Sequence, residues 1–314
     1  MSEKKPPTDA TRNQPPQHGL PARNGVSPSC VGLPVGSWPT ILAFLIERFP
    51  AIPREDWLAR VEAGLVVDEF GAPVTAGRPY PGQMRVYYYR ALEHEPEIPF
   101  LETILYQDDH LVVADKPHFL QVTPSGPFLQ QTLLVRLKNR LGLEDLAPIH
   151  RIDRETAGLV MFSVRRQDRD AYQGLFRRHE IVKHYEAIAP WRADLVFPKV
   201  LKSRLVEDEP FFFRQREAPG TPNSESHIGV LDIKGALARY ALSPVTGKKH
   251  QLRVHMNSLG LPILNDRIYP PVPVTPADDF RFPLQLLAKS IEFIDPLTGQ
   301  PRRFESALKL SFPV

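Results

Sequence analysis

The chain has 314 residues, of which 42% are hydrophobic, and it carries a formal net charge of +3. That length is enough for two domains or for one large domain with an appendage, and the apolar fraction can bury a full core. The sequence has no apolar run of the roughly 18 residues that a membrane-spanning helix needs, and Cys30 is its only cysteine. Membrane insertion, secretion, an internal disulfide and a cysteine-bound zinc are therefore not expected, and a reducing cytoplasm is the predicted compartment.

Residues 1–36 form the first segment along the chain. They are rich in Pro, Ser, Asn and Gly and contain few large apolar side chains. Such a composition buries too little surface to offset the entropy of ordering the chain, so a disordered tail is predicted here.

Residues 37–92 show a different pattern, in which apolar residues recur at helical spacing over 41–45 and again over 57–61. Residues 65–67 and 84–89 have the apolar and aromatic composition of strands. A small module of two helices followed by strands is therefore predicted.

Residues 93–100, in which Glu and Pro alternate, are predicted to be a linker into a larger domain over 101–314. In that domain, short apolar runs predict strands, and periodic segments predict helices. The predicted strands are 111–115, 159–164, 185–189 and 237–242, and the predicted helices are 129–141, 167–178 and 251–259. Strands and helices do not alternate regularly, and short polar turns join several strands. This order favours an α+β fold around a mixed, largely antiparallel sheet.

The segment 150–160 contains the first candidate functional residue, Asp153, which lies between Arg151 and Arg154. We expect the two neighbouring guanidinium groups to keep this carboxyl ionised at neutral pH, because opposite charge nearby lowers a carboxyl pKa. An ionised carboxylate can attack carbon or stabilise a cation. A structural ion pair or a turn cap explains this window equally well.

The same segment, His-Arg-Ile-Asp-Arg-Glu-Thr-Ala-Gly-Leu-Val, resembles the signature of the RluA-type pseudouridine synthases, with Ile152 for leucine and Ala157 for serine. Four further blocks resemble that family in the expected order, and the combination is far more specific than any single block. These blocks are Val112–Pro117, Lys183–Ala187, Thr246–His255 and Leu286–Gly299. In the last of them, Leu287 and Asp295 replace family histidines.

The module over 37–92 resembles the S4-type RNA-binding domain that often precedes such catalytic domains, through a Val-x-x-Gly-Leu-Val stretch and a late Pro-Gly. Its second helix carries charges of both signs and lacks the basic face of a phosphate-binding helix, so a degenerate S4-like module is expected. For the tail over 1–36, an alternative to a disordered role is a contact between its basic residues and RNA.

The resemblance implies an enzyme that breaks the N1–C1′ bond of uridine, rotates the base and rejoins it through C5, without a cofactor or a metal. Asp153 matches the catalytic aspartate, and both covalent addition to C1′ and a glycal intermediate stay open. Arg253 matches the arginine that pairs with this aspartate. Tyr185 matches the tyrosine that stacks on the target base, and Arg151 matches the arginine that fills the stack when the uridine is everted.

Three further residues are expected near the substrate. Lys183 is expected to be a cation close to the RNA, and Ile152 and Leu287 to form apolar walls around the uracil. Alternatives stay open for several of these residues. Core packing explains Ile152 and Leu287 equally well, and a phosphate contact is the alternative for Arg151.

Histidines 150, 250 and 255 do not form a convincing set of metal ligands, because residues five apart on a helix do not share a face. No metal is therefore predicted, and the resemblance gives His250 a structural role.

The predicted function is that of an RNA pseudouridine synthase acting on rRNA or tRNA, as a monomer and without a membrane partner. One alternative is a non-catalytic RNA-binding or ribosome-assembly factor that retains the fold. A second is a carboxylate-dependent nucleoside or sugar hydrolase, but the second acid or base that such an enzyme needs is not evident.

Overall fold

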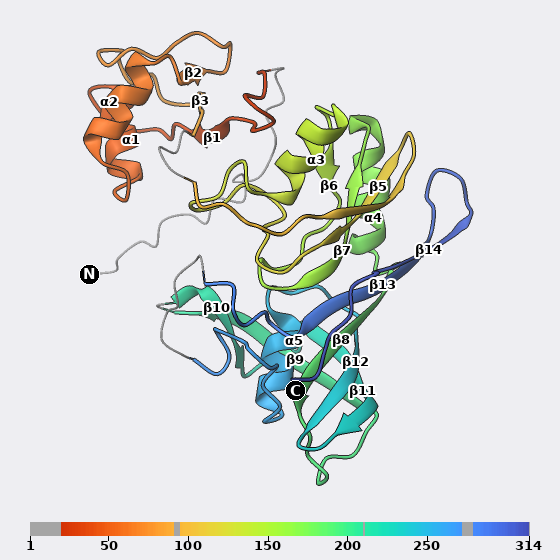
Figure 1. Ribbon diagram of the computed structural model, residues 1–314. Helices are drawn as coiled ribbons and strands as arrows, with labels where there is room; N and C mark the ends of the chain where they lie inside the picture. Colours follow the sequence, from red (N-terminus) through yellow and green to blue (C-terminus); the bar gives the residue numbers. More distant parts are fainter. Residues whose placement is uncertain (1–19, 91–94, 210, 272–278, 314) are drawn as a thin grey trace. The chain divides into compact units, whose positions relative to one another are not determined.

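The computed structural model describes residues 20–90, 95–209, 211–271 and 279–313. The chain divides into two compact units, Met1–Glu95 and Pro96–Val314 (Figure 1). Of the predicted tail over 1–36, residues 1–19 lie outside the described residues, whereas Ser29–Gly32 forms strand β1. Val31 and Leu33 are buried in the core of the first unit, so this part of the predicted tail is folded.

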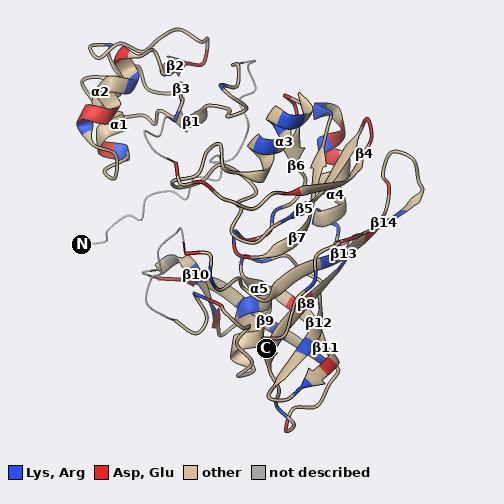
Figure 2. Ribbon diagram, in the orientation of Figure 1, with Lys and Arg blue, Asp and Glu red and all other residues tan. Residues whose placement is uncertain are grey.

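The first unit contains α1 (Ile41–Arg48), α2 (Arg54–Glu62), β2 (Val66–Asp68) and β3 (Arg85–Tyr88). Its three strands form an antiparallel sheet in the order β1-β3-β2. The helices and strands of the predicted module are therefore present. Acidic and basic side chains are intermixed on α2 (Figure 2), and the likeness to an S4-type domain stays a prediction.

The predicted linker over 93–100 ends inside the second unit, which begins at Pro96. Ile98 is 2% exposed, and the guanidinium of Arg136 donates hydrogen bonds to the carbonyls of Ile98 and Phe100, each at 2.7 Å. Residues 93 and 94 lie outside the described residues. The end of this segment is therefore fixed to the larger unit by an arginine that satisfies two backbone acceptors.

The second unit is built on an 11-stranded sheet whose main path runs β10-β9-β11-β12-β8-β13-β7-β5-β4, with β14 paired to β13 and β6 to β7. The strands are β4 (Thr103–Gln107), β5 (Leu111–Lys116), β6 (Ala147–Pro148), β7 (Ala157–Ser163), β8 (Val182–Pro190), β9 (Lys199–Asp208), β10 (Phe211–Ala218), β11 (Ser224–Lys234), β12 (Leu237–Pro244), β13 (Leu286–Ile294) and β14 (Pro301–Glu305). Every pairing is antiparallel except that of β13 with β7. The predicted α+β class with a mixed, largely antiparallel sheet is confirmed.

In the described part of this unit, three α-helices accompany the sheet: α3 (Leu133–Leu141), α4 (Arg169–Arg177) and α5 (Gln251–Ser258). Strands β5 and β7 are buried along their whole length, because α3 packs on one face and α4 on the other. Both helices are shorter than predicted. A short 3-10 turn, Arg166–Asp168, precedes α4, and Thr132 is the extended N-cap residue of α3.

Strand β13 lies between β8 and β7 and joins the two halves of the sheet. Ala288 pairs with Gly158 of β7 on one side and with Tyr185 of β8 on the other. Gly158 has φ +109°, and a Cβ there would lie 2.3 Å from the carbonyl oxygen of Ala288. Only glycine therefore permits this close approach.

Within the described ranges, no helix combines the length and the apolar character needed to cross a bilayer.

Candidate active site

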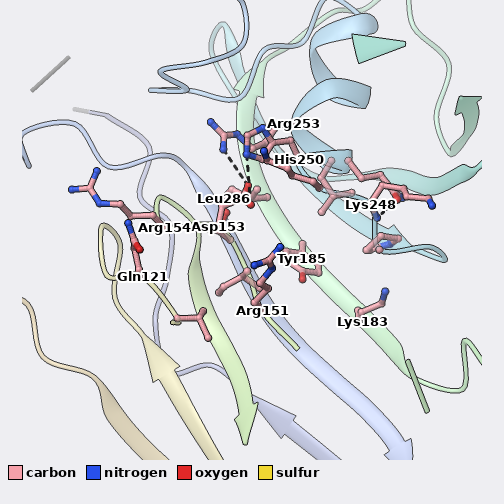
Figure 3. A pocket seen from close by; sticks show the side chains of 18 of the residues that line it. Gln121, Arg151, Asp153, Arg154, Lys183, Tyr185, Lys248, His250, Arg253 and Leu286 are labelled. Atoms are coloured by element: carbon pink, nitrogen blue, oxygen red, sulfur yellow. Dashed lines mark hydrogen bonds and ion pairs between the residues drawn. The ribbon is translucent and has the colours of Figure 1, made fainter. Parts of the chain in front are cut away.

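A cavity of 510 Å³ lies where the two halves of the sheet meet (Figure 3). Its walls come from residues 121–125 after β5, from the loop before β7, from β8, from the loop that leads into α5, from α5 itself and from the first residue of β13. The volume falls in the range of about 300–1,000 Å³ that is usual for pockets binding small ligands. The structure therefore offers room for a single nucleotide-sized group.

Asp153 and Arg253, a hundred residues apart in sequence, meet in this cavity. Nη1 of Arg253 donates a hydrogen bond to Oδ2 of Asp153 at 3.1 Å. The side chain of Arg253 is 1% exposed, whereas that of Asp153 is 27% exposed. The arginine is thus sealed in the protein, while the carboxylate is open to the cavity.

Asp266 holds the other side of Arg253, and sequence analysis missed it. Nε and Nη2 of Arg253 donate to the two oxygens of Asp266, at 2.8 and 2.7 Å. The carboxylate of Asp266 also accepts the amides of Ile268 and Tyr269. Because a two-point contact fixes the plane of a guanidinium, Asp266 orients Arg253 toward Asp153.

The pKa of Asp153 lies below its ordinary value. Burial by itself raises the pKa of this carboxyl, but three nearby groups outweigh that effect. They are His250, which is protonated only in the acidic range where this carboxyl titrates, Arg253, through its charge and its hydrogen bond, and Lys116. Burial also lowers the pKa of His250 to about 4, so its ring is uncharged at neutral pH. Arg253, whose pKa is raised by Asp266 and Asp153 against the opposing effect of burial, is the permanent cation beside Asp153.

The two arginines adjacent in sequence do not hold Asp153, contrary to expectation. Arg154 pairs with Glu155 at 3.0 Å and stacks over the ring of Phe128. Arg151 is exposed and makes no hydrogen bond or ion pair with Asp153. Asp153 and Arg154 are successive residues whose side chains point in different directions, so adjacency in sequence does not bring this guanidinium to the carboxylate.

The loop that carries Asp153 is fixed through its backbone. Nζ of the fully buried Lys116 donates to the carbonyl of Arg154 at 3.1 Å and to that of Leu120 at 2.7 Å. A ring nitrogen of His118 contacts the carbonyl of Glu155 at 2.8 Å. Two contacts from the end of β5 and the residues after it therefore fix the backbone directly after Asp153.

Tyr185 and Lys183, on β8, also line the cavity, as do Arg151 and Ile152. Burial, together with the charge of Asp153, raises the pKa of Tyr185, so its hydroxyl keeps its proton at neutral pH. Burial lowers the pKa of Lys183 to about 8. The structure thus brings together six of the seven predicted site residues.

Leu287 is the exception, because it does not line the cavity. It is 1% exposed and packs in a core cluster with Ala157, Ile188 and Leu310. Leu286, the preceding residue, lines the cavity instead. Side chains alternate between the two faces of a strand, so an error of one residue along β13 moves a leucine from the cavity to the core.

The histidines that were considered as metal ligands make separate protein contacts. His150 accepts the amide of Met161 at 3.2 Å, and His255 contacts Ser203, Ser224 and Ser226. In the described part of the chain, no three His, Cys, Asp or Glu side chains gather as a metal-binding group.

Comparisons with known proteins match the same region. A family model described as RNA pseudouridylate synthase matches residues 110–258. An uncharacterized RNA pseudouridine synthase of Synechocystis is 30% identical over 236 residues, which cover 74% of this chain and 79% of that protein. The dual-specificity RNA pseudouridine synthase RluA of Haemophilus influenzae is 30% identical over 222 residues, which cover 68% of this chain and 97% of that protein.

A solved structure gives the same answer for the fold. The human RNA pseudouridylate synthase domain containing 4 superposes with a TM-score of 0.51 and 27% identity, covering 66% of this chain and 88% of its own. The resemblance found in the sequence is therefore confirmed, and the alternative of a non-catalytic factor is not favoured. The chain belongs to the RluA-type RNA pseudouridine synthases, enzymes that isomerise uridine to pseudouridine in RNA.

Proposed function

We propose that Asp153 is the catalytic carboxylate of this enzyme, with Arg253 as its partner, Tyr185 as the platform for the target base and Arg151 as the wedge that replaces the everted uridine. The observation that carries this proposal is the Asp153–Arg253 pair, at 3.1 Å, on the wall of a cavity that also contains Tyr185.

The reaction needs a carboxylate that is ionised and correctly oriented near C1′ of the ribose. Arg253 donates to Oδ2 of Asp153, which keeps the group charged, and the side chain of Asp153 is 27% exposed, so the substrate can reach it. The N1–C1′ bond breaks, the uracil turns within the cavity, and a C5–C1′ bond forms as the C5 proton leaves and N1 takes up a proton. Nothing is gained or lost overall, so no external reactant is needed. This assignment serves covalent addition and a glycal intermediate equally.

Tyr185 fits the role of a platform better than that of a base. Its pKa is raised, so the neutral phenol has no free charge with which to take a proton. A flat aromatic ring on the cavity wall can stack on an unpaired base, a contact worth about 1–3 kcal/mol in other proteins. The exposed guanidinium of Arg151 is free to enter the gap that the everted nucleotide leaves in the RNA.

The substrate class and setting belong to the same proposal. The name of the Haemophilus relative indicates that it acts with dual specificity, and this supports considering both rRNA and tRNA as substrates here. Lys183, Ile152 and Leu286 then contact the everted nucleotide and its surroundings. We further propose that the enzyme acts as a monomer in the cytoplasm.

The test is the substitution Asp153→Asn, assayed by release of tritium from RNA that contains [5-³H]uridine. The shape is preserved and Arg253 keeps Asp266, so the variant should fold. Its turnover should fall by about 10³-fold or more, the order seen when a catalytic group is removed. Asp170→Asn is the matched control, because Asp170 is 89% exposed and lies outside the cavity. Full turnover by Asp153→Asn would refute the assignment.

Analysis of the product RNA separates the hydrolase alternative from the synthase. A hydrolase that uses Asp153 would release free uracil and leave an abasic site, whereas a synthase retains the base in the chain. Chromatography of the digested product RNA should show pseudouridine and no loss of base. Free uracil in proportion to turnover would favour the hydrolase.

A further inference from the structure

His250 faces the second oxygen of the proposed catalytic carboxylate and is not used in the mechanism above. Its Nε2 lies 3.8 Å from Oδ1 of Asp153, on the side opposite the Arg253 contact, and its side chain is 8% exposed. His250 has φ +55°, the left-handed conformation, directly before α5. A non-glycine residue in that conformation is strained and is kept only where its surroundings hold it.

Tyr269 is the partner of the second ring nitrogen of His250. Its hydroxyl oxygen accepts the amide of Gln215 at 2.7 Å and lies 2.9 Å from Nδ1 of His250. Among the described residues, Nδ1 is the only acceptor within reach of the hydroxyl proton. The phenol therefore donates to Nδ1, which leaves Nδ1 without a proton of its own.

A neutral imidazole that accepts at Nδ1 must carry its proton on Nε2, the nitrogen that faces Asp153. The ring is neutral at pH 7, because burial lowers its pKa to about 4. The charged and titratable groups around it are Asp153, Arg253, Lys249, Asp266 and Tyr269. Of these groups, Asp153 is the anion that Nε2 of His250 faces.

We propose that His250 is a positioning residue, a neutral Nε2–H donor that holds Oδ1 of Asp153, and that Tyr269 fixes its tautomer. The inference rests on the proposed role of Asp153. The distance of 3.8 Å is longer than a hydrogen bond, as is common before substrate binds, and it closes when the nucleotide fills the cavity. Arg253 and His250 then fix one oxygen each and set the plane of the carboxylate.

The first test is nitrogen NMR of the full chain labelled in its histidine rings. The signal of His250, assigned by its loss in His250→Gln, should show protonated Nε2 and unprotonated Nδ1 at pH 7. In Tyr269→Phe, Nδ1 loses its donor, so the His250 titration should move above pH 4. An Nδ1–H tautomer or a charged ring in the wild-type protein would overturn the proposal. So would a titration that Tyr269→Phe leaves in place.

The second test compares two amides in a single-turnover assay. The amide nitrogen of Gln reaches the position of Nε2 and keeps a donor toward Asp153, whereas that of Asn reaches only the position of Nδ1. His250→Asn should therefore lose about 10- to 100-fold in the rate of the chemical step with unchanged RNA affinity, and His250→Gln should recover most of it. Asn tolerates the left-handed conformation better than Gln, so a merely structural role would reverse this order and overturn the proposal.

These outcomes are distinguishable from a failure of the proposed function. NMR reads the tautomer of His250 without any turnover, so it tests the proposal for His250 by itself. Full activity of Asp153→Asn would instead refute the catalytic role of Asp153.

Discussion

The cavity combines two regions of opposite character, a buried centre and a cationic rim. In the centre, Arg253 is shared between Asp153 and Asp266, and each charge has a partner. The rim consists of Arg151, Lys183, Lys248 and Lys249, which are exposed or half-buried. No carboxylate of the described residues pairs with the first three of them. Charges that are neutralised in the protein orient a reacting group, whereas charges left open attract a polyanion.

The largest effect is expected when the cation at the centre is removed. Arg253→Met leaves the carboxylates of Asp153 and Asp266 without their counterion, and breaking a buried pair typically costs about 3–5 kcal/mol. The free energy of unfolding, measured in urea, should fall by that order, and pseudouridine formation should be lost.

Arg303→Met is the control for this loss. Arg303 pairs with Glu292 at 3.2 Å, but its side chain is 64% exposed, so water screens the pair. Its removal should leave stability and turnover nearly unchanged. Equal stability of the two variants would show that Arg253 is not part of a buried network.

The basic side chains of the rim should affect RNA binding and not the rate of the isomerisation step. Burial lowers the pKa of Lys183 to about 8, so its ammonium is charged below that pH and neutral above it. RNA affinity should therefore weaken as the pH rises from about 7 to about 9. In Lys183→Met this dependence should disappear, and the slope of log affinity against log salt should fall by roughly one.

Lys309→Met is the matched control, because Lys309 is exposed and does not line the cavity. Its salt slope and pH dependence should equal those of the wild-type protein. A Lys183→Met enzyme that binds RNA normally but reacts slowly would place Lys183 in the centre instead of the rim.

The smallest effect is expected in the first unit. Helix α2 carries Arg54 and Arg60 together with Glu55, Asp56 and Glu62, so its surface has no basic face. Arg54→Gln should therefore change the dissociation constant for RNA by less than about twofold, against the order of tenfold for loss of one good phosphate contact. Filter binding at low salt measures this, and a larger loss would show that α2 contacts RNA.

Much of the site was predictable from sequence because its residues lie in short motifs that can be recognised without the structure. Asp153, Tyr185 and Arg253 lie in separate blocks that resemble family motifs, and the structure brings all three to one cavity. The strands β5 and β7 were also predicted, since burial on both faces gives a continuous apolar run.

Other features were not predictable because they arise only from tertiary contacts. Asp266 lies in a loop that matches no recognised motif. Its role in orienting Arg253 becomes visible only in the folded structure, where the two side chains form hydrogen bonds. Strand β9 alternates between exposed and half-buried residues along most of its length, so it lacks the apolar signal of a core strand. The choice between Leu286 and Leu287 depends on the register of β13, which is set by its pairing with β8.

The contact at Gly158 has a consequence for how this enzyme tolerates change. The aspartate loop continues into β7, and the tyrosine is on β8, so the strand between them sets the spacing of the two groups. Replacing the hydrogen of that one glycine by a methyl group would force the strands apart and pull carboxylate and aromatic ring away from each other. Gly158 therefore sets the distance between the proposed catalytic carboxylate and the proposed platform for the base.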